Sequence, residues 1–439
     1  MLKKIAVSQL RLGMYLHKLE GKWLEHPFWR TTFVLDSVDD LRRLQASTVR
    51  ECWIDPGLGL DVAAPVAPVA PDAMPPASAS APASVSVPAP VPVLTAAPAA
   101  PAAVVPPAAP RQRQRQTMAA ELREASAICG RGRKAVMAMF NEARMGRSID
   151  AEGCRVLVDD ITASVERNPG ALVSLARLKT RDDYSYMHSV AVCALMVALA
   201  RQLGLNDQAC RQAGLAGLMH DIGKALMPLE VLNKPGRLTD AETRVIRSHA
   251  LRGHELLKDG AGTTPEMLDV VLNHHERVDG TGYPRRLPAE RLSTLARMGA
   301  ICDVYDAITS NRPYKAGWDP AESIARMASW RGQFDEKIFA AFVQSLGIYP
   351  TGSLVALASE RLAVVTEQNP GALVKPVVKV FFSLRSQLRC TPVSLDLSRA
   401  GCKDRIVGRH QAAEGSFGRL EDLWLDPELQ RRLPASAPA

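Results

Sequence analysis

A stretch of low-complexity sequence, residues 62–110, divides this chain of 439 residues. Fourteen of its 49 residues are proline, none is glycine, and Asp72 carries its one charge. Such a segment lacks the large side chains that offset the entropy of ordering, and its prolines favour an extended conformation that could span about 150 Å. The chain therefore cannot form one compact domain. We expect folded parts on either side of a semi-rigid spacer.

The sequence on the two sides of the spacer differs in periodicity, which predicts a mainly α fold class. Residues 1–60 combine short strand-like segments with one helix, as in a small α+β domain, and residues 61–116 form the Pro/Ala-rich linker. From residue 117 apolar positions recur every three to four residues, so 117–350 is predicted to be all-helical. Residues 351–439 are strand-like again and predict a β-rich extension, either packed on the helical part or hanging from it.

Two sets of residues make this prediction specific. The predicted apolar centre of residues 1–60 is aromatic: Trp23, Phe28, Trp29, Phe33 and Trp53. Helices are expected at 118–144, 149–167, 170–178, 184–204, 206–219, 239–258, 265–277, 288–310, 319–330 and 335–346.

Charge, cysteine usage and hydropathy limit the classes of function. The longest continuous apolar run is 190–200, which is too short to cross a bilayer, and the N-terminus has no apolar core of a secretory signal. The 8 cysteines lie singly, as expected for reduced thiols in a cytoplasmic protein. The net charge of +8 includes basic runs at 111–116 and 131–134. Because no aromatic residue lies among them, we expect solvated segments there and no nucleic-acid polymer as a partner.

Histidines gather in one part of the helical region. Six of the nine fall between residues 188 and 275, including the doublets His220-Asp221 and His274-His275. A lone histidine on a helix is usually a packed core residue, but six with carboxylates nearby indicate a metal site. Imidazole and carboxylate without thiolate suit iron, manganese or zinc better than magnesium or calcium. The candidate ligands are His188, His220, Asp221, His249, His274, His275 and Asp303.

Seven ligands are more than one ion needs, since a single zinc site takes three or four. They suit two or more ions bridged by a carboxylate such as Asp221. At 100° per helical residue, His274 and His275 would reach different parts of a shared site, or different ions. Two ions can activate a bridging water and flank both oxygens of an in-line phosphoester displacement.

Three further features lie beside these ligands. Lys224 follows Asp221 by three residues and could neutralise charge on a phosphate or protonate a leaving oxygen, although a solvated surface lysine is the alternative. The glycine-containing loop 274–284 could form a wall of a substrate pocket, or be a plain turn between helices. Residues 311–315 place two cations and a tyrosine after the helix of Asp303, where they could hold phosphate and nucleobase.

Several motifs together resemble an HD-GYP domain, a subgroup of the HD phosphohydrolases that cleaves cyclic di-GMP. They are HDIGK (220–224), KPG (234–236), HHERVDGTGYP (274–284), CDVYDAITSNRPYK (302–315) and GIYPTGSLV (347–355). Residues 1–60 resemble a small domain of unknown function that often precedes such domains. The resemblance implies that the seven candidate residues bind metal, that Lys224, Asp221 and His220 carry catalysis, and that Arg312, Lys315 and Tyr283 contact the substrate. His254 and His410 match no family position.

The resemblance also sets the expected function. It implies a metal-dependent phosphodiesterase that converts cyclic di-GMP to linear pGpG, with further cleavage to GMP less secure. One alternative is a catalytically weak module that binds cyclic di-GMP or signalling proteins, and another is hydrolysis of a different nucleotide. Some family members have a glutamate where this chain has Tyr184, which argues against a third ion. We therefore expect two metals, iron or manganese with zinc as the alternative, and the sequence sets no oligomeric state.

Overall fold

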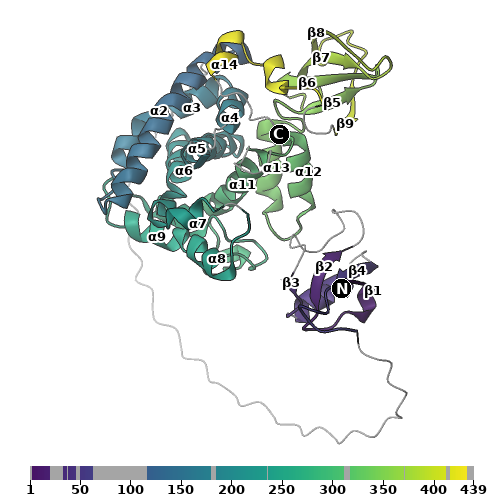
Figure 1. The fold of residues 1–439 in the computed structure, drawn as a ribbon. Coiled ribbons are helices and arrows are strands. Elements are labelled where there is room, and N and C mark those ends of the chain that lie inside the picture. The colour runs from purple at the N-terminus through teal and green to yellow at the C-terminus, as the bar shows by residue number, and fades with distance from the viewer. Residues whose placement is uncertain are drawn as a thin grey trace, which may run out of the picture. The chain divides into compact units, whose positions relative to one another are not determined.

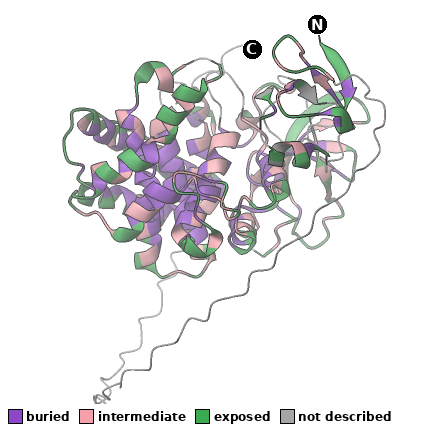
Figure 2. Cartoon of the chain, turned by 90° about the horizontal axis from the view of Figure 1, so that it is seen from below, coloured by how far each residue is buried: buried purple, intermediate pink, exposed green. Residues whose placement is uncertain are grey.

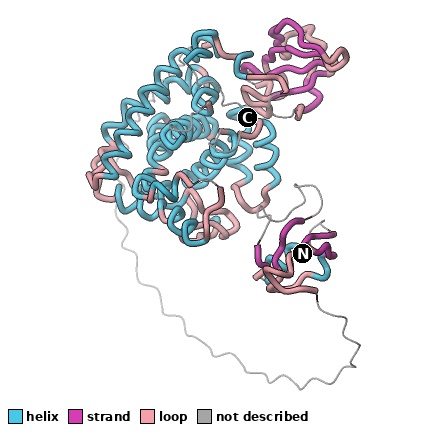
Figure 3. The backbone as a smooth tube through the Cα atoms, in the orientation of Figure 1, coloured by secondary structure: helices cyan, strands magenta, loops and turns pink. Residues whose placement is uncertain are grey.

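The structure is a computed structural model that describes residues 2–19, 33–36, 38–45, 50–62, 116–178, 184–234, 236–310, 317–369, 371–411 and 416–432. The chain separates into two compact units, residues 1–104 and 105–439. Helices make up most of the second unit, and each unit contains one β-sheet (Figures 1 and 3). The predicted spacer between residues 63 and 110 lies outside the described residues.

The N-terminal unit is a four-stranded antiparallel sheet with one helix. Its strands are β1 (Lys3–Ala6), β2 (Tyr15–Leu19), β3 (Phe33–Val34) and β4 (Glu51–Ile54), in the order β1-β4-β2-β3, and its helix is α1 (Val38–Gln45). The aromatic centre predicted from the sequence is tested at Trp53 alone, which is half-buried. Trp23, Phe28, Trp29 and the side chain of Phe33 lie outside the described residues. The described buried core is aliphatic with one thiol: Ile5, Val7, Leu10, Met14, Leu16, Leu35, Leu44, Cys52 and Ile54.

The second unit is built mainly from helices. Their order along the chain is α2 (Met118–Arg144), α3 (Arg155–Arg167), α4 (Pro169–Arg177), α5 (Tyr184–Gln202), α6 (Asp207–Met219), α7 (Leu229–Leu232), α8 (Asp240–Arg247), α9 (His249–Leu257), α10 (Pro265–Asn273), α11 (Thr294–Thr309), α12 (Pro320–Ser329) and α13 (Glu336–Leu346). Short 3₁₀ turns lie at η3 (Glu152–Cys154), η4 (Ile222–Leu226) and η5 (Ala289–Arg291).

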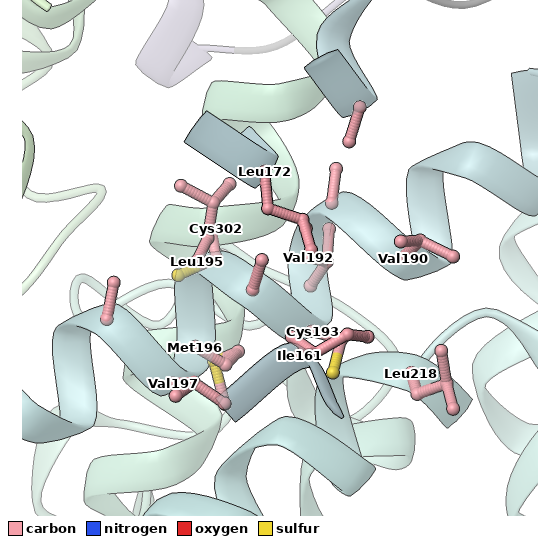
Figure 4. Close-up of a cluster of buried hydrophobic side chains, with 14 of the residues drawn as sticks. Ile161, Leu172, Val190, Val192, Cys193, Leu195, Met196, Val197, Leu218 and Cys302 are labelled. Carbon is pink, nitrogen blue, oxygen red and sulfur yellow. The ribbon is translucent and has the colours of Figure 1, made fainter. Parts of the chain in front are cut away.

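Helix α5 is the centre of this unit. The apolar run 190–200 covers every side of the helix, and a helix that is apolar all round must be buried. Every residue from Met187 to Ala200 is buried. Figure 2 shows the buried segments in the middle of the helical unit, and Figure 4 shows Cys193 and Met196 of α5 beside Ile161 of α3 and Leu218 of α6. This packing fixes the helices that carry the histidines.

Two predicted helices are each interrupted. The expected helix 239–258 divides at Ser248 into α8 and α9, so that His249 begins a new helix. The expected helix 288–310 is a 3₁₀ turn followed by α11, because the Ser293 side chain accepts a hydrogen bond from the Ala296 N–H and caps a new N-terminus. The apolar spacing continues across both breaks, which is why the periodicity did not reveal them.

The C-terminal extension is packed on the helical unit. Its strands are β5 (Leu354–Leu357), β6 (Arg361–Glu367), β7 (Val377–Ser383), β8 (Leu388–Asp396) and β9 (Ile406–Arg409), in the order β8-β7-β6-β5-β9. The turn η6 (Leu420–Leu423) and helix α14 (Pro427–Arg432) follow. One sheet face joins the helical core through Leu362, Val364 and Phe381. The other face has its own cluster, which includes Val355 and Val365.

The described helices include none that combines the length and the apolar composition of a membrane-spanning segment.

Candidate metal centre

Five helices bring the seven candidate ligands together. His188 lies on α5, His220 and Asp221 directly follow α6, and His249 begins α9. His274 and His275 directly follow α10, and Asp303 lies on α11. Their ligand atoms form two groups, and within each group all of these atoms lie within 4.8 Å of one another. One group is His188, His220, Asp221 and Asp303, and the other is Asp221, His249, His274 and His275.

Asp221 is the one residue that belongs to both groups, and its two oxygens are divided between them. Oδ2 lies 3.3 Å from His220 Nε2 and 3.4 Å from His188 Nε2. Oδ1 lies 3.2 Å from His249 Nε2 and 3.8 Å from His274 Nε2. This is the arrangement of a carboxylate that bridges two ions. His274 and His275 belong to the same group.

The outer nitrogens of three histidines are held by backbone carbonyls. Nδ1 of His220 donates to the Gly217 carbonyl at 2.7 Å, and Nδ1 of His249 donates to the Ile246 carbonyl at 2.7 Å. Nδ1 of His274 lies 3.0 Å from two carbonyls of α10. A carbonyl can only accept, so these nitrogens carry the proton and each Nε2 presents a lone pair to the cluster. This is the tautomer that a metal ligand requires.

The inner nitrogens lie close to one another inside the cluster. His220 Nε2 lies 3.2 Å from His188 Nε2, and His249 Nε2 lies 3.3 Å from His274 Nε2. Asp221 Oδ1 is buried and has no hydrogen-bond partner. A buried carboxylate oxygen without a donor is costly, and a divalent cation bound by it and by the converging imidazole nitrogens would satisfy it. The residues present therefore fit divalent metal ions.

Three members of the cluster, His274, Asp221 and Asp303, have ionisation states that suit metal binding, whereas the neighbouring carboxylates raise the pKa of His188, whose proton a metal ion would displace. Burial, aided by the neighbouring His220 and His249, lowers the pKa of His274 to about 3, so that its imidazole is neutral at pH 7. Burial alone would raise the pKa of Asp221, but Lys224 and His220 hold it well below its usual range. Burial would likewise raise the pKa of Asp303, but His188 and His275 hold it low. Neutral imidazoles and ionised carboxylates are the forms that bind metal.

Lys224 lies on the same carboxylate. It is part of η4, and its ammonium forms a short ion pair with Asp221 Oδ2. Its side chain is 22% exposed, whereas that of Asp221 is 3% exposed, so the ammonium lies between the buried cluster and the solvent. The sequence interpretation placed Lys224 on the side of the doublet, and the structure has it there. A cation at this position can meet an anionic substrate that approaches the cluster.

The loop after His275 is held against the cluster by a buried glutamate. Glu276 Oε1 accepts a hydrogen bond from the Arg285 N–H at 2.6 Å, and Oε2 accepts one from the Leu287 N–H at 3.1 Å. The Tyr283 ring stacks on His275 with their centroids 4.6 Å apart. The Arg247 guanidinium lies over the Tyr283 ring, with its Cζ 5.0 Å from the ring centroid. The loop therefore forms a wall beside the least buried histidine of the cluster.

The other site residues considered in the sequence analysis have different outcomes. Arg312 and Lys315 lie outside the described residues, and so does the side chain of Tyr184. His254 and His410 belong to neither group of ligands. Sequence reasoning missed Asp306, a buried residue whose Oδ2 lies 2.6 Å from His188 Nδ1. It also missed Glu276. The signal for Asp306 was its position three residues after Asp303, which places both on one side of α11.

The chain is similar to two domain families and, along nearly its whole length, to one known protein. Residues 2–154 match the domain of unknown function DUF3391, and residues 165–338 match the HD domain. The chain is 51% identical to a cyclic di-GMP phosphodiesterase of Pseudomonas aeruginosa, over 97% of this chain and 96% of that protein. The first match extends past residue 60, across the spacer and α2, to the end of η3.

Two other relatives match a shorter part of this chain. The chain is 36% identical to a cyclic di-GMP phosphodiesterase response regulator of Xanthomonas campestris pv. campestris, over 41% of this chain and 48% of that protein. It is 35% identical to a 3'3'-cGAMP-specific phosphodiesterase of Vibrio cholerae, over 38% of each chain. This chain thus spans about half or less of these two proteins.

Proposed function

Because this chain belongs to the family of HD-domain cyclic di-GMP phosphodiesterases, we propose that it hydrolyses cyclic di-GMP to linear pGpG in a metal-dependent reaction. The observation that carries the proposal is the division of the two Asp221 oxygens between two groups of buried histidines. A bridging carboxylate suits a pair of ions that flank one phosphodiester. Full-length identity to a relative named for this activity supports the substrate.

Two divalent ions, iron or manganese with zinc as the alternative, are proposed at the cluster. Asp221 would bridge them, with His188, His220 and Asp303 on one ion and His249, His274 and His275 on the other. The donor set of imidazole and carboxylate without thiolate supports this choice of metals. Elemental analysis of protein purified at low oxygen should give close to two equivalents. A third equivalent would show that Tyr184 does not prevent a further site.

Bound metal would lower the pKa of a water molecule, so that a nucleophile forms at neutral pH. The residues of this chain would orient the ligands, bind the phosphate and exclude water. The four hydrogen-bonded histidines keep their Nε2 atoms directed into the cluster. Lys224, between Asp221 and solvent, would bind a phosphate oxygen and neutralise the charge that grows on it, or pass a proton to the leaving oxygen. The metal ligands other than His275 are buried, and their burial excludes bulk water from the cluster.

Substrate contacts are proposed on the exposed side of the cluster. Tyr283, stacked on His275, offers a flat ring on which a guanine could lie, and Arg247 beside it could meet a phosphate. Arg312 and Lys315 stay proposals that rest on the family motif. Cytoplasmic location and signalling-protein partners also stay predictions from the sequence.

The test is hydrolysis by protein loaded with Mn²⁺ or Fe²⁺ under low oxygen. Cyclic di-GMP, 3'3'-cGAMP and pGpG should be compared as substrates, with products separated by chromatography. We expect cyclic di-GMP to be converted to pGpG, and Asp221→Ala protein to be inactive. Exclusive turnover of 3'3'-cGAMP would replace the proposed substrate, and release of GMP from pGpG would extend the reaction by one step. Tight binding of cyclic di-GMP without turnover would favour a signalling module instead.

A further inference from the structure

A cavity lies between the helical bundle and the C-terminal sheet, next to the metal cluster but outside it. It has a volume of about 320 Å³ and is bounded by α4, α11, the turn before β5 and the end of β6. Sites for small molecules have volumes of about 300–1,000 Å³, so this one suits a compact ligand. None of the seven candidate metal ligands lines it.

Arg177, at the end of α4, brings a positive charge to this cavity. No acidic side chain among the described residues forms an ion pair with it, and no hydrogen bond of its guanidinium is found there. Space for the guanidinium is provided by Gly352, where a Cβ atom would overlap Arg177 Nη2. Gly352 has a φ of +89°, which a residue with a side chain rarely adopts. The absence of a side chain at Gly352 therefore leaves room for the Arg177 guanidinium in this turn.

Two buried oxygens in the same cavity have no partner. Thr351 is 5% exposed, and its hydroxyl makes no hydrogen bond. The amide of Gln368 donates through Nε2 to the Tyr349 carbonyl at 2.7 Å, which leaves its buried Oε1 without a donor. Buried polar atoms almost always have a partner, and one left without costs about 1–3 kcal/mol. A ligand that carries hydroxyl groups would satisfy both.

The other charged groups of the cavity are already paired. Arg167 binds the buried Glu121 through two hydrogen bonds of 2.6 and 2.8 Å. Asp306 holds His188, and Glu367 accepts a hydrogen bond from the Met118 N–H at 3.2 Å. Arg177 is thus the charged residue of the cavity for which the described residues show neither an ion pair nor a hydrogen bond.

We propose that this cavity binds a small hydroxylated molecule that carries one phosphate or carboxylate group. The anionic group would meet the Arg177 guanidinium, and the hydroxyl groups would donate to Gln368 Oε1 and exchange a hydrogen bond with Thr351. The occupant would also touch Asp306, whose carboxylate holds His188, so the site adjoins the metal cluster without sharing its ligands. The proposal does not depend on the reaction catalysed there.

The test uses the full-length, Mn²⁺-loaded protein and isothermal titration calorimetry. Glycerol 3-phosphate probes the phosphate form of the ligand, glycerate probes the carboxylate form, and glycerol is the uncharged control. We expect one of the two anions to bind at millimolar concentration or below, and glycerol not to bind. Arg177→Gln should weaken binding at least about tenfold, because it removes a hydrogen bond to a charged group. Thr351→Val, which keeps the volume, should weaken binding severalfold.

The metal cluster itself is the competing place for an anion, so Asp221→Asn protein provides the control. Binding of the anion should persist in that variant once circular dichroism has shown that it is folded. The proposal would be overturned if neither anion bound, if both cavity variants bound as the parent does, or if folded Asp221→Asn protein lost binding. If Arg177→Gln proves unfolded, Thr351→Val decides between these outcomes.

Discussion

Asp306 Oδ2 lies 2.6 Å from Nδ1 of His188, while Nε2 of the same ring faces Asp303 Oδ1 at 3.0 Å. The imidazole is therefore held between two carboxylates of α11, one outside the cluster and one within it. Burial alone would lower the pKa of His188, but Asp221, Asp303 and Asp306 raise it well above its usual value. An outer carboxylate of this kind fixes the ring and increases its basicity as a ligand.

We therefore expect Asp306→Asn to weaken Mn²⁺ binding by about 10–100-fold, the usual effect of removing an outer partner of a metal ligand. The side-chain volume is unchanged, so the fold should remain. Mn²⁺ titration followed by calorimetry measures the effect, and Ser310→Ala, which removes a 3.3 Å hydrogen bond to Asp306 Oδ1, is the control. A dissociation constant within twofold of the parent would contradict a positioning role for Asp306.

Asp221 and His275 should differ in how many ions their loss removes. Asp221 belongs to both groups of ligands, and His275 belongs to one. We expect Asp221→Asn to lose both equivalents of metal and His275→Ala to lose about one. Elemental analysis after removal of free metal gives the count. Equal losses in the two variants would contradict a bridging position for Asp221.

Lys224→Met should lower kcat by about 100–1,000-fold at saturating metal and change metal affinity much less. The ammonium is the cation between Asp221 and solvent, and loss of one donor to a developing negative charge has effects of this size. Lys258→Met, which removes an exposed ion pair with Glu255, is the matched control. Steady-state kinetics with cyclic di-GMP measure the change. An unchanged kcat would show that Lys224 has no role in the reaction.

Gly223→Ala should destabilise the protein by about 3 kcal/mol, at the upper end of the usual cost of overpacking. A Cβ atom at Gly223 would overlap the His249 carbonyl oxygen where η4 crosses α9, and the change should also weaken metal binding. Gly130→Ala is the control, because a Cβ atom there meets nothing within 4 Å and the position is exposed on α2. Thermal unfolding compares the two. A neutral Gly223→Ala would show that η4 can shift without cost.

Residues 1–111 should be dispensable for folding of the helical unit. The contacts of the two units separate near residue 104, and the capping of α2 begins at Gln116, whose N–H donates to the Arg167 carbonyl. A chain that starts at residue 112 should therefore melt at the same temperature and bind the same amount of metal as the full-length protein. Loss of cooperative unfolding would mean that residues 1–60 stabilise the helical unit directly, against the predicted boundaries.

The sequence by itself determined the features that depend on local chemistry. The apolar run 190–200 could only be a buried helix, and the proline-rich segment could not belong to a core. The doublets at 220 and 274 predicted a site of imidazole and carboxylate, and α2 has the bounds that its periodicity predicts. Residue type and spacing carry this information because it is contained in one stretch of chain at a time.

The tertiary structure determined the features that depend on atoms from separate segments of the chain. It divided the two oxygens of Asp221 between two groups of histidines, placed Asp306 against His188, and used Glu276 to hold the loop of Tyr283. It also packed the C-terminal sheet on the helices and formed the cavity at Arg177. The sequence alone could not show these relationships, because each depends on the distance between side chains that only the packing of α5 against its neighbours establishes.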